Sequence, residues 1–156
     1  MQTFDRETTG ARRPTRTDDL TGTHENTGGG VAAARGFRWL VAVSTVLVFV
    51  QALLAGRGWF ITPDLLKVHG YLGSLTFVIV IGQLGLAFVA WRRGVLGIAP
   101  AILSALLLLL VTSQLGLGYA GRESAAAASW HIPNGVLIFG VLAGLLGQAG
   151  GRRVGY

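Results

Sequence analysis

The sequence predicts an all-α integral membrane protein, a four-helix bundle built from two repeated helical hairpins. Of its 156 residues, 51% are hydrophobic and only 13% are charged, and the mean hydropathy is +0.57. These values are too apolar for a water-soluble domain of this length. Four apolar segments follow one another closely, and each reaches about 20 residues, enough to cross a hydrocarbon core of about 30 Å. The segments span residues 37–56, 64–91, 95–118 and 130–149.

The two ends of the chain lie outside these segments. Residues 1–34 are rich in Thr, Gly and Arg and mix acids with bases, so we predict a disordered cytoplasmic tail in which His24 is a solvated bystander. No apolar stretch precedes Phe37, and the first apolar segment must therefore direct insertion itself. The four-helix domain is expected to cover residues 35–151, and residues 152–156 form a short cytoplasmic C-terminus.

A motif containing one histidine occurs twice. In each copy a glutamine lies near the end of one apolar segment, a histidine opens the next, and a glycine follows the histidine by four positions. The copies are Gln51, His69 and Gly73, and Gln114, His131 and Gly135. The repeat indicates a duplicated hairpin, whose copies are related by an axis along the membrane normal. The two histidines should then face one another at one depth, from helices that are diagonal neighbours.

Two imidazoles at equivalent positions favour haem over a simple metal ion. Zinc usually takes three or four protein ligands, whereas haem already supplies four nitrogens and needs only two axial ligands. The chain has no cysteine, which excludes thiolate ligation and covalent attachment. We therefore predict a b-type haem with His69 and His131 as axial ligands of the iron, and with Gly73 and Gly135 leaving room for the porphyrin. Gln51 and Gln114 are expected either to hydrogen-bond a histidine ring or haem propionates, or only to link helices.

Other interpretations remain open. A histidine near a membrane interface is often an anchor that reaches the headgroups, so the alternative is a haem-free structural or accessory subunit of a larger membrane complex. Expected partners are the lipid bilayer, a redox partner or quinone, and further copies or a larger complex. Nucleic acid is not expected despite the net charge of +6, because no recognition module is visible. A transporter is disfavoured because no carboxylate lies within the apolar segments.

The order of these residues resembles one four-helix half of haem A synthase. The similarity covers residues 37–149, and it implies that His69 and His131 are haem ligands. That family has a glutamate three residues before the first histidine and an arginine just after it, where this chain has Leu66 and Gly70. We therefore expect haem binding for electron transfer or haem handling, and no enzyme activity of the chain on its own. In size it is closer to small, uncharacterised four-helix prokaryotic membrane proteins.

The distribution of arginines predicts the orientation, because Lys and Arg are retained in short cytoplasmic flanks. Pairs of arginines lie beside the start of the first apolar segment, between the second and third, and after the fourth: Arg35 and Arg38, Arg92 and Arg93, Arg152 and Arg153. Both termini should be cytoplasmic, with the histidine layer near the outer face. Reporter fusions after residue 34, at Gly94 and at the C-terminus should all report cytoplasm. An external signal at Gly94 would reverse this orientation.

Overall fold

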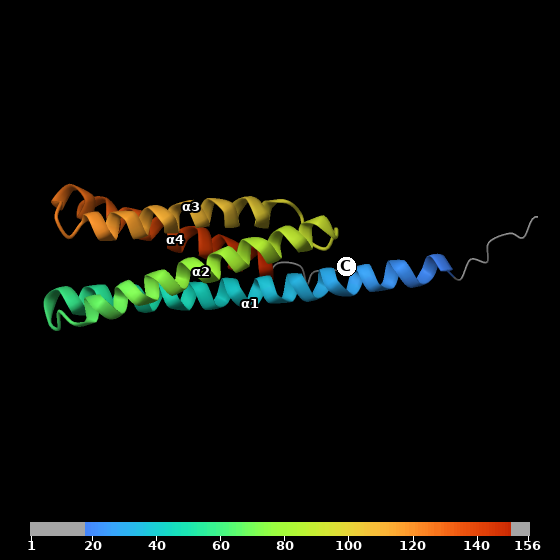
Figure 1. Ribbon diagram of the computed structural model, residues 1–156, viewed down its shortest axis with the longest axis horizontal. Helices are drawn as coiled ribbons and strands as arrows, with labels where there is room; N and C mark the ends of the chain where they lie inside the picture. Colours follow the sequence, from blue (N-terminus) through green and yellow to red (C-terminus); the bar gives the residue numbers. More distant parts are fainter. Residues whose placement is uncertain (1–17, 151–156) are drawn as a thin grey trace, which may run out of the picture.

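The computed structural model describes the backbone of residues 18–150 and the side chains of residues 28–148. The described chain consists of four α-helices joined by short connections, with no strand between residues 18 and 150 (Figure 1). They are α1 (Asp18–Phe60), α2 (Leu65–Arg92), α3 (Ala99–Ala120) and α4 (Ala125–Gly150). The prediction of an all-α, four-helix fold is confirmed.

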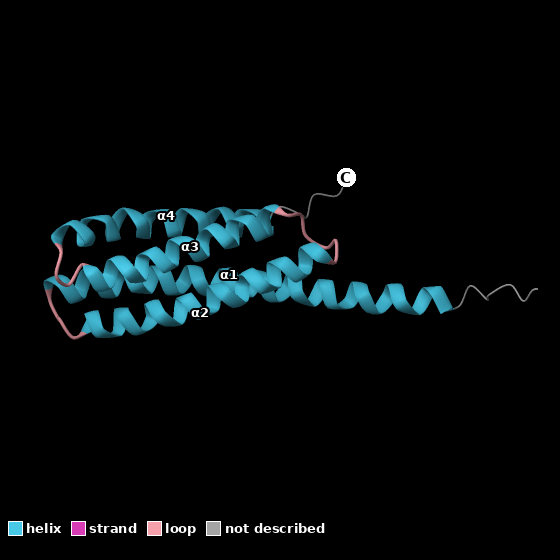
Figure 2. Cartoon of the chain, turned by 45° about the horizontal axis from the view of Figure 1, so that its top comes forward, coloured by secondary structure: helices cyan, strands magenta, loops and turns pink. Residues whose placement is uncertain are grey.

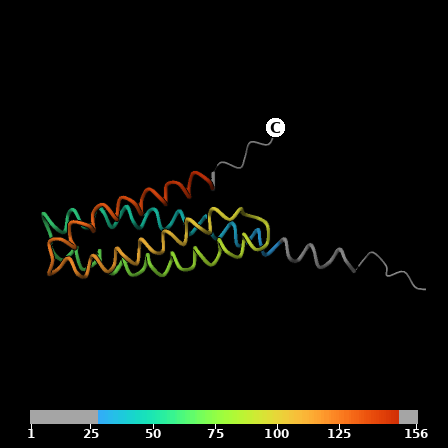
Figure 3. Tube along the Cα trace, turned by 90° about the horizontal axis from the view of Figure 1, so that it is seen from above, coloured from blue at the N-terminus to red at the C-terminus, as the bar shows by residue number. Residues whose placement is uncertain are grey.

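The helices run up and down in sequence order. The α1–α2 and α3–α4 connections lie at one end of the bundle, at the left in Figures 1 and 2, and the α2–α3 connection lies at the other. The N-terminal part of α1 projects past the ends of the other helices. Neighbours in sequence pack together and α1 packs against α4, whereas no backbone contact joins α1 to α3 or α2 to α4 within the described residues (Figure 3). As predicted, α2 and α4 are therefore diagonal neighbours.

The outer surface of the bundle is strongly apolar. Each helix contains a window long and apolar enough to cross a membrane, and at most 22% of any such window is buried inside the bundle. Large side chains such as Val46, Val78 and Leu109 are more than 60% exposed on the helix surfaces. A water-soluble monomer rarely shows apolar surface on this scale. The surface is therefore of the kind that lipid would cover.

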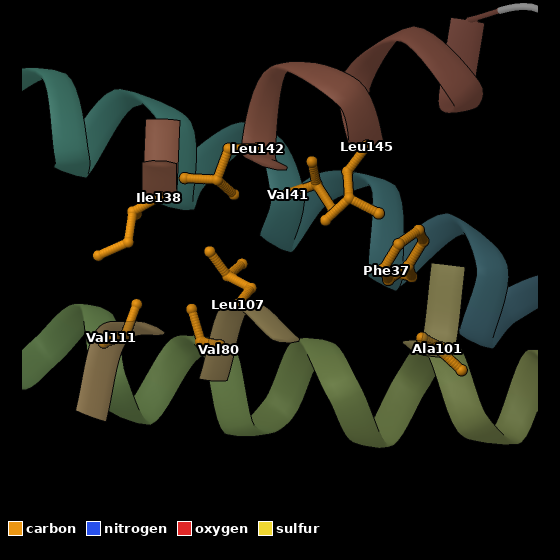
Figure 4. Packing of buried hydrophobic residues seen from close by; sticks show 10 residues of the cluster. Phe37, Val41, Val80, Ala101, Leu107, Val111, Ile138, Leu142 and Leu145 are labelled. Carbon is orange, nitrogen blue, oxygen red and sulfur yellow. The ribbon is translucent and has the colours of Figure 1, made fainter. Parts of the chain in front are cut away.

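The interior is formed by all four helices. Phe37 and Val41 from α1 and Val80 from α2 meet buried side chains of α3 and α4 in one core (Figure 4). The α3 and α4 members shown are Ala101, Leu107, Val111, Ile138, Leu142 and Leu145. Branched and aromatic side chains of this size fill the space between helices at the density of a protein interior.

A buried polar chain crosses this core. The fully buried Gln83 of α2 accepts a hydrogen bond from Ser44 Oγ of α1 at 3.3 Å, and its Nε2 donates to Ser104 Oγ of α3 at 3.3 Å. His69, Thr76 and Gln83 follow one another at intervals of seven residues, which predicts that one face of α2 points inward. Thr76 and Gln83 are buried, as that spacing predicts.

The start of α1 differs from the sequence prediction. We expected a helix from residue 37 after a disordered tail, but α1 begins at Asp18, and residues 18–34 belong to it. Residues 1–17 and 151–156 lie outside the described chain. Ala33 and Ala34 are buried with Ala90 of α2 and are packed against Val95 and Leu96 of the following loop. These small residues give no apolar periodicity in the sequence, yet they let α1 approach the α2–α3 connection closely.

Apart from the start of α1, every helix begins and ends within five residues of the predicted limits. We expected the third helix to start at residue 95, but the chain turns at Gly94, which has φ +70, and the N–H groups of Val95 and Leu96 bond Ala90 O at 2.9 and 3.2 Å. The fourth begins at Ala125 instead of residue 130, because a run of alanines continues the helix outward and Pro133 is accommodated inside it. The backbone N–H of Ala127 donates to Ser124 Oγ at 3.3 Å at this end.

The close approach of α1 to the α2–α3 loop can be tested at two glycines. A Cβ on Gly30 would lie 2.6 Å from Val95 Cγ2 and 2.9 Å from Arg93 Cβ, whereas a Cβ on Gly28 would meet nothing within 4 Å. Replacing a helical glycine by alanine gains about 1 kcal/mol from helix propensity, and forcing extra volume into a packed site costs about 1–3 kcal/mol. Gly30→Ala should therefore lower the free energy of unfolding in detergent relative to Gly28→Ala. Equal stabilisation by both substitutions would contradict this packing.

Candidate functional site

The two histidines of the repeated motif meet inside the bundle. His69 lies near the start of α2 and His131 near the start of α4, at the end where the two hairpins turn. Their ring centroids are 6.0 Å apart, with 66° between the ring planes. Because the backbones of α2 and α4 make no contact, the two imidazoles bridge the diagonal of the bundle with their side chains alone.

His69 is held by the backbone of α1. Its Nδ1 lies 2.9 Å from the carbonyl oxygen of Gln51. A carbonyl oxygen can only accept, so Nδ1 must carry the proton and donate it. In the neutral ring Nε2 then keeps its lone pair, and this arrangement, with Nδ1–H on a carbonyl, is the one that commonly orients a metal-ligating histidine.

The side chain of Gln51 has a different partner from its backbone. Its Nε2 donates to Thr76 Oγ1 at 2.8 Å, and the Thr76 hydroxyl in turn donates to Leu72 O at 2.8 Å. A Cβ on Gly73 would lie 3.3 Å from Gln51 Oε1. Because Gly73 has no side chain, the Gln51 amide can lie between α1 and α2. The sequence offered two roles for Gln51, and the observed contact of its side chain is a link between helices.

The second copy is built in a related way with different polar partners. A Cβ on Gly135 would lie 3.2 Å from Gln114 Nε2, so this glycine also admits the amide of the preceding helix. Gln114 Oε1 accepts a hydrogen bond from Asn134 Nδ2 at 2.6 Å, and the same nitrogen donates to Leu110 O at 2.9 Å. Amide side chains, and no open space, therefore adjoin both glycines.

His131 differs from His69 in its hydrogen bonding. Its Nδ1 is buried and has no hydrogen-bond partner among the described residues. The backbone of Gln114 lies near the ring, but its contact with Nδ1 does not have the geometry of a full hydrogen bond. A buried polar atom without a partner is costly and calls for an explanation, such as a role toward a bound group.

His69 and His131 could serve as the only protein ligands of a metal that a cofactor already binds, such as the iron of haem. No group of three or more His, Cys, Asp or Glu side chains lies together in the part of the chain that the structure describes. Two nitrogen–metal bonds of about 2 Å each, together with the size of the imidazole rings, are compatible with the 6.0 Å between the ring centroids. The separation of the two imidazoles is therefore compatible with an axial pair on a haem, in which the Nδ1 atoms would face the protein, that of His69 toward Gln51 O and that of His131 toward Gly118.

The contacts of two residues in this region were not predicted from the sequence. Asn134 carries an amide inside an apolar segment, three residues after His131. Because polar side chains are rare in such segments, its presence could have indicated a contact inside the bundle. Thr76 was placed on the inward face of α2, but its bond to Gln51 depends on the register of α1 against α2. Such a register is not visible in one sequence.

The separate roles of the Gln51 backbone and side chain predict a selective effect. Gln51→Met removes the bond to Thr76 but keeps the carbonyl that accepts from His69 Nδ1. The substitution should lower the free energy of unfolding by roughly 0.6–2 kcal/mol, the range for interhelical bonds in membranes. The ¹⁵N resonances of the His69 ring should stay in place. Thr76→Val is the matched variant and should behave alike, whereas a displaced His69 resonance in Gln51→Met would contradict this division of roles.

Comparison with protein families, with curated proteins and with solved structures finds no match to this chain.

Proposed function

We propose that this chain is a multi-pass membrane protein that holds one b-type haem between α2 and α4, with His69 and His131 as the axial ligands of the iron. The observation that carries the proposal is the meeting of the two imidazoles across the bundle diagonal, at 6.0 Å between ring centroids. Nothing in the core packing of four apolar helices requires two histidines to meet there. A polar pair in such a setting is costly, which makes a functional role the default interpretation.

The contacts of the two rings support the ligand roles. His69 donates from Nδ1 to Gln51 O, which leaves Nε2 for iron. His131 is half-buried, and its buried Nδ1 has no complete hydrogen bond within the described chain. Without cysteine, the group has to be held by these side chains and by packing alone, as a b-type haem is.

The number of protein ligands decides which chemistry the site favours. Haem, when bound, supplies one-electron redox chemistry, and oxygen activation needs an open axial position. Two imidazoles fill both positions, so the site favours electron transfer or haem handling over catalysis. Among the protein residues, the Gln51 carbonyl orients the His69 ring by accepting its Nδ1 proton, whereas the bond between Thr76 and the Gln51 side chain links α1 and α2.

The proposal includes the orientation in the membrane. The arginine pairs of the sequence favour a cytoplasmic location for both termini and the α2–α3 connection, and on this proposal the histidine pair lies toward the outer face. In support, the histidines lie at the end of the bundle opposite the α2–α3 connection that carries Arg93.

A second candidate is a haem-free structural or accessory subunit of a larger membrane complex. The observation that favours it is the packing of the Gln51 and Gln114 amides beside Gly73 and Gly135, where they hydrogen-bond Thr76 and Asn134 and so link neighbouring helices. A reduced-minus-oxidised absorption spectrum of protein purified after expression with adequate haem separates the two candidates. The absence of a haem band would reject the haem proposal.

The paired-ligand model makes a prediction about single and double variants. His69→Ala and His131→Ala should each lose haem or give a high-spin spectrum, because each removes one of two axial ligands. The double variant should be little worse than the worse single variant, since groups that act as a unit are not additive. His24→Ala is the control and should leave the spectrum unchanged. A normal spectrum in His131→Ala would defeat the pairing, although it would leave haem binding itself in place.

A further inference from the structure

The two hairpins hold their histidines in different ways, although their sequences repeat. In the first hairpin the His69 ring is fixed by a hydrogen bond from Nδ1 to the Gln51 carbonyl. In the second hairpin the backbone of Gln114 also lies near the ring, but no contact at Nδ1 of His131 has the geometry of a full hydrogen bond among the described residues. Contacts of another kind therefore contribute to the position of the second ring.

A glycine of α3 lies directly against that ring. A Cβ built on Gly118 would lie 3.2 Å from Cε1 and 3.5 Å from Nδ1 of His131. The first distance is shorter than ordinary van der Waals contact between carbon atoms, so a side chain here would press on the imidazole edge that carries Nδ1. Gly116, two residues earlier on α3, has nothing within 4 Å of the same built atom.

We propose that Gly118 is a positioning residue for His131. Its missing Cβ lets the imidazole lie against the backbone of α3, in the place where the ring faces His69. Packing against Gly118 thus orients the His131 ring, whereas a hydrogen bond to the Gln51 carbonyl orients the His69 ring. That Gly118 positions a haem ligand rests on the proposed function. That Gly118 positions the His131 ring does not depend on haem binding.

The sequence offers a physical reason for the difference between the hairpins. His69 follows Gln51 by 18 residues and His131 follows Gln114 by 17, so the two connections differ in length by one residue. The residue four positions after each glutamine also differs. It is Ala55 in the first hairpin and Gly118 in the second, where a Cβ would lie against the histidine ring.

The experiment compares substitutions of two glycines on the same helix. Gly118→Ala and Gly118→Val are paired with Gly116→Ala and Gly116→Val, which add the same bulk away from the ring. In haem-free protein in detergent, the ring ¹⁵N resonances of His131 should shift in the Gly118 variants, more for valine than for alanine, while those of His69 move less. The Gly116 variants should leave both rings unchanged. Equal shifts from the two glycines, or no shift from Gly118, would overturn the proposal.

The haem-loaded protein supplies the second measurement. Displacing an orienting contact typically costs about 10- to 100-fold in metal affinity, so Gly118→Val should lose haem affinity on this scale and gain high-spin character. In a His131→Ala background the same change should have no further effect, because Gly118 acts through that ring. A further loss in that background would overturn the assignment. If the wild-type protein shows no haem band, the proposed function fails, while the ring resonances still decide the role of Gly118.

Discussion

Hydrogen bonds between polar groups of different helices constrain the register of this bundle, because a buried polar group left without a partner is costly. Along the seam between α1 and α2, Gln51 bonds Thr76 and accepts from His69, and Ser44 bonds Gln83 further along. Each such bond adds only about 0.6 kcal/mol in a membrane, but a slip of register would leave several buried groups unsatisfied at once. The seam therefore specifies one alignment, and that alignment sets the position of His69.

The second hairpin satisfies the same constraint with other residues. Its glutamine pairs with Asn134, and the hydroxyl that Thr76 provides in the first hairpin has no counterpart, because Ile138 lies seven residues after His131 and belongs to the apolar core. Duplication would explain the shared pattern of glutamine, histidine and glycine. After divergence of the surrounding polar residues, the two imidazoles would keep similar positions but differ in their hydrogen bonds.

The sequence predicts the helices well because length and apolar content are properties of each segment alone. It also predicts the inward face of α2, since a seven-residue spacing returns Thr76 and Gln83 to one side of a helix. Contacts between helices are less accessible: Gly73 was expected to leave room for a cofactor, yet it adjoins an amide from α1. The early start of α1 was missed for a similar reason, because its small residues are buried only by tertiary packing.

The diagonal placement of the histidines has a consequence for assembly. Each hairpin supplies one imidazole, so neither hairpin alone can provide an axial pair, and a group bound by both rings would bind only when the hairpins are packed together. Binding that requires the folded state stabilises it, and here the stabilised step is the association of α1–α2 with α3–α4. The protein contacts between the hairpins run along α2–α3 and α1–α4, and the α1–α2 pair is in more extensive contact than either. A ligand across the diagonal would thus join the two hairpins, whose contacts with one another are less extensive than the contact between α1 and α2.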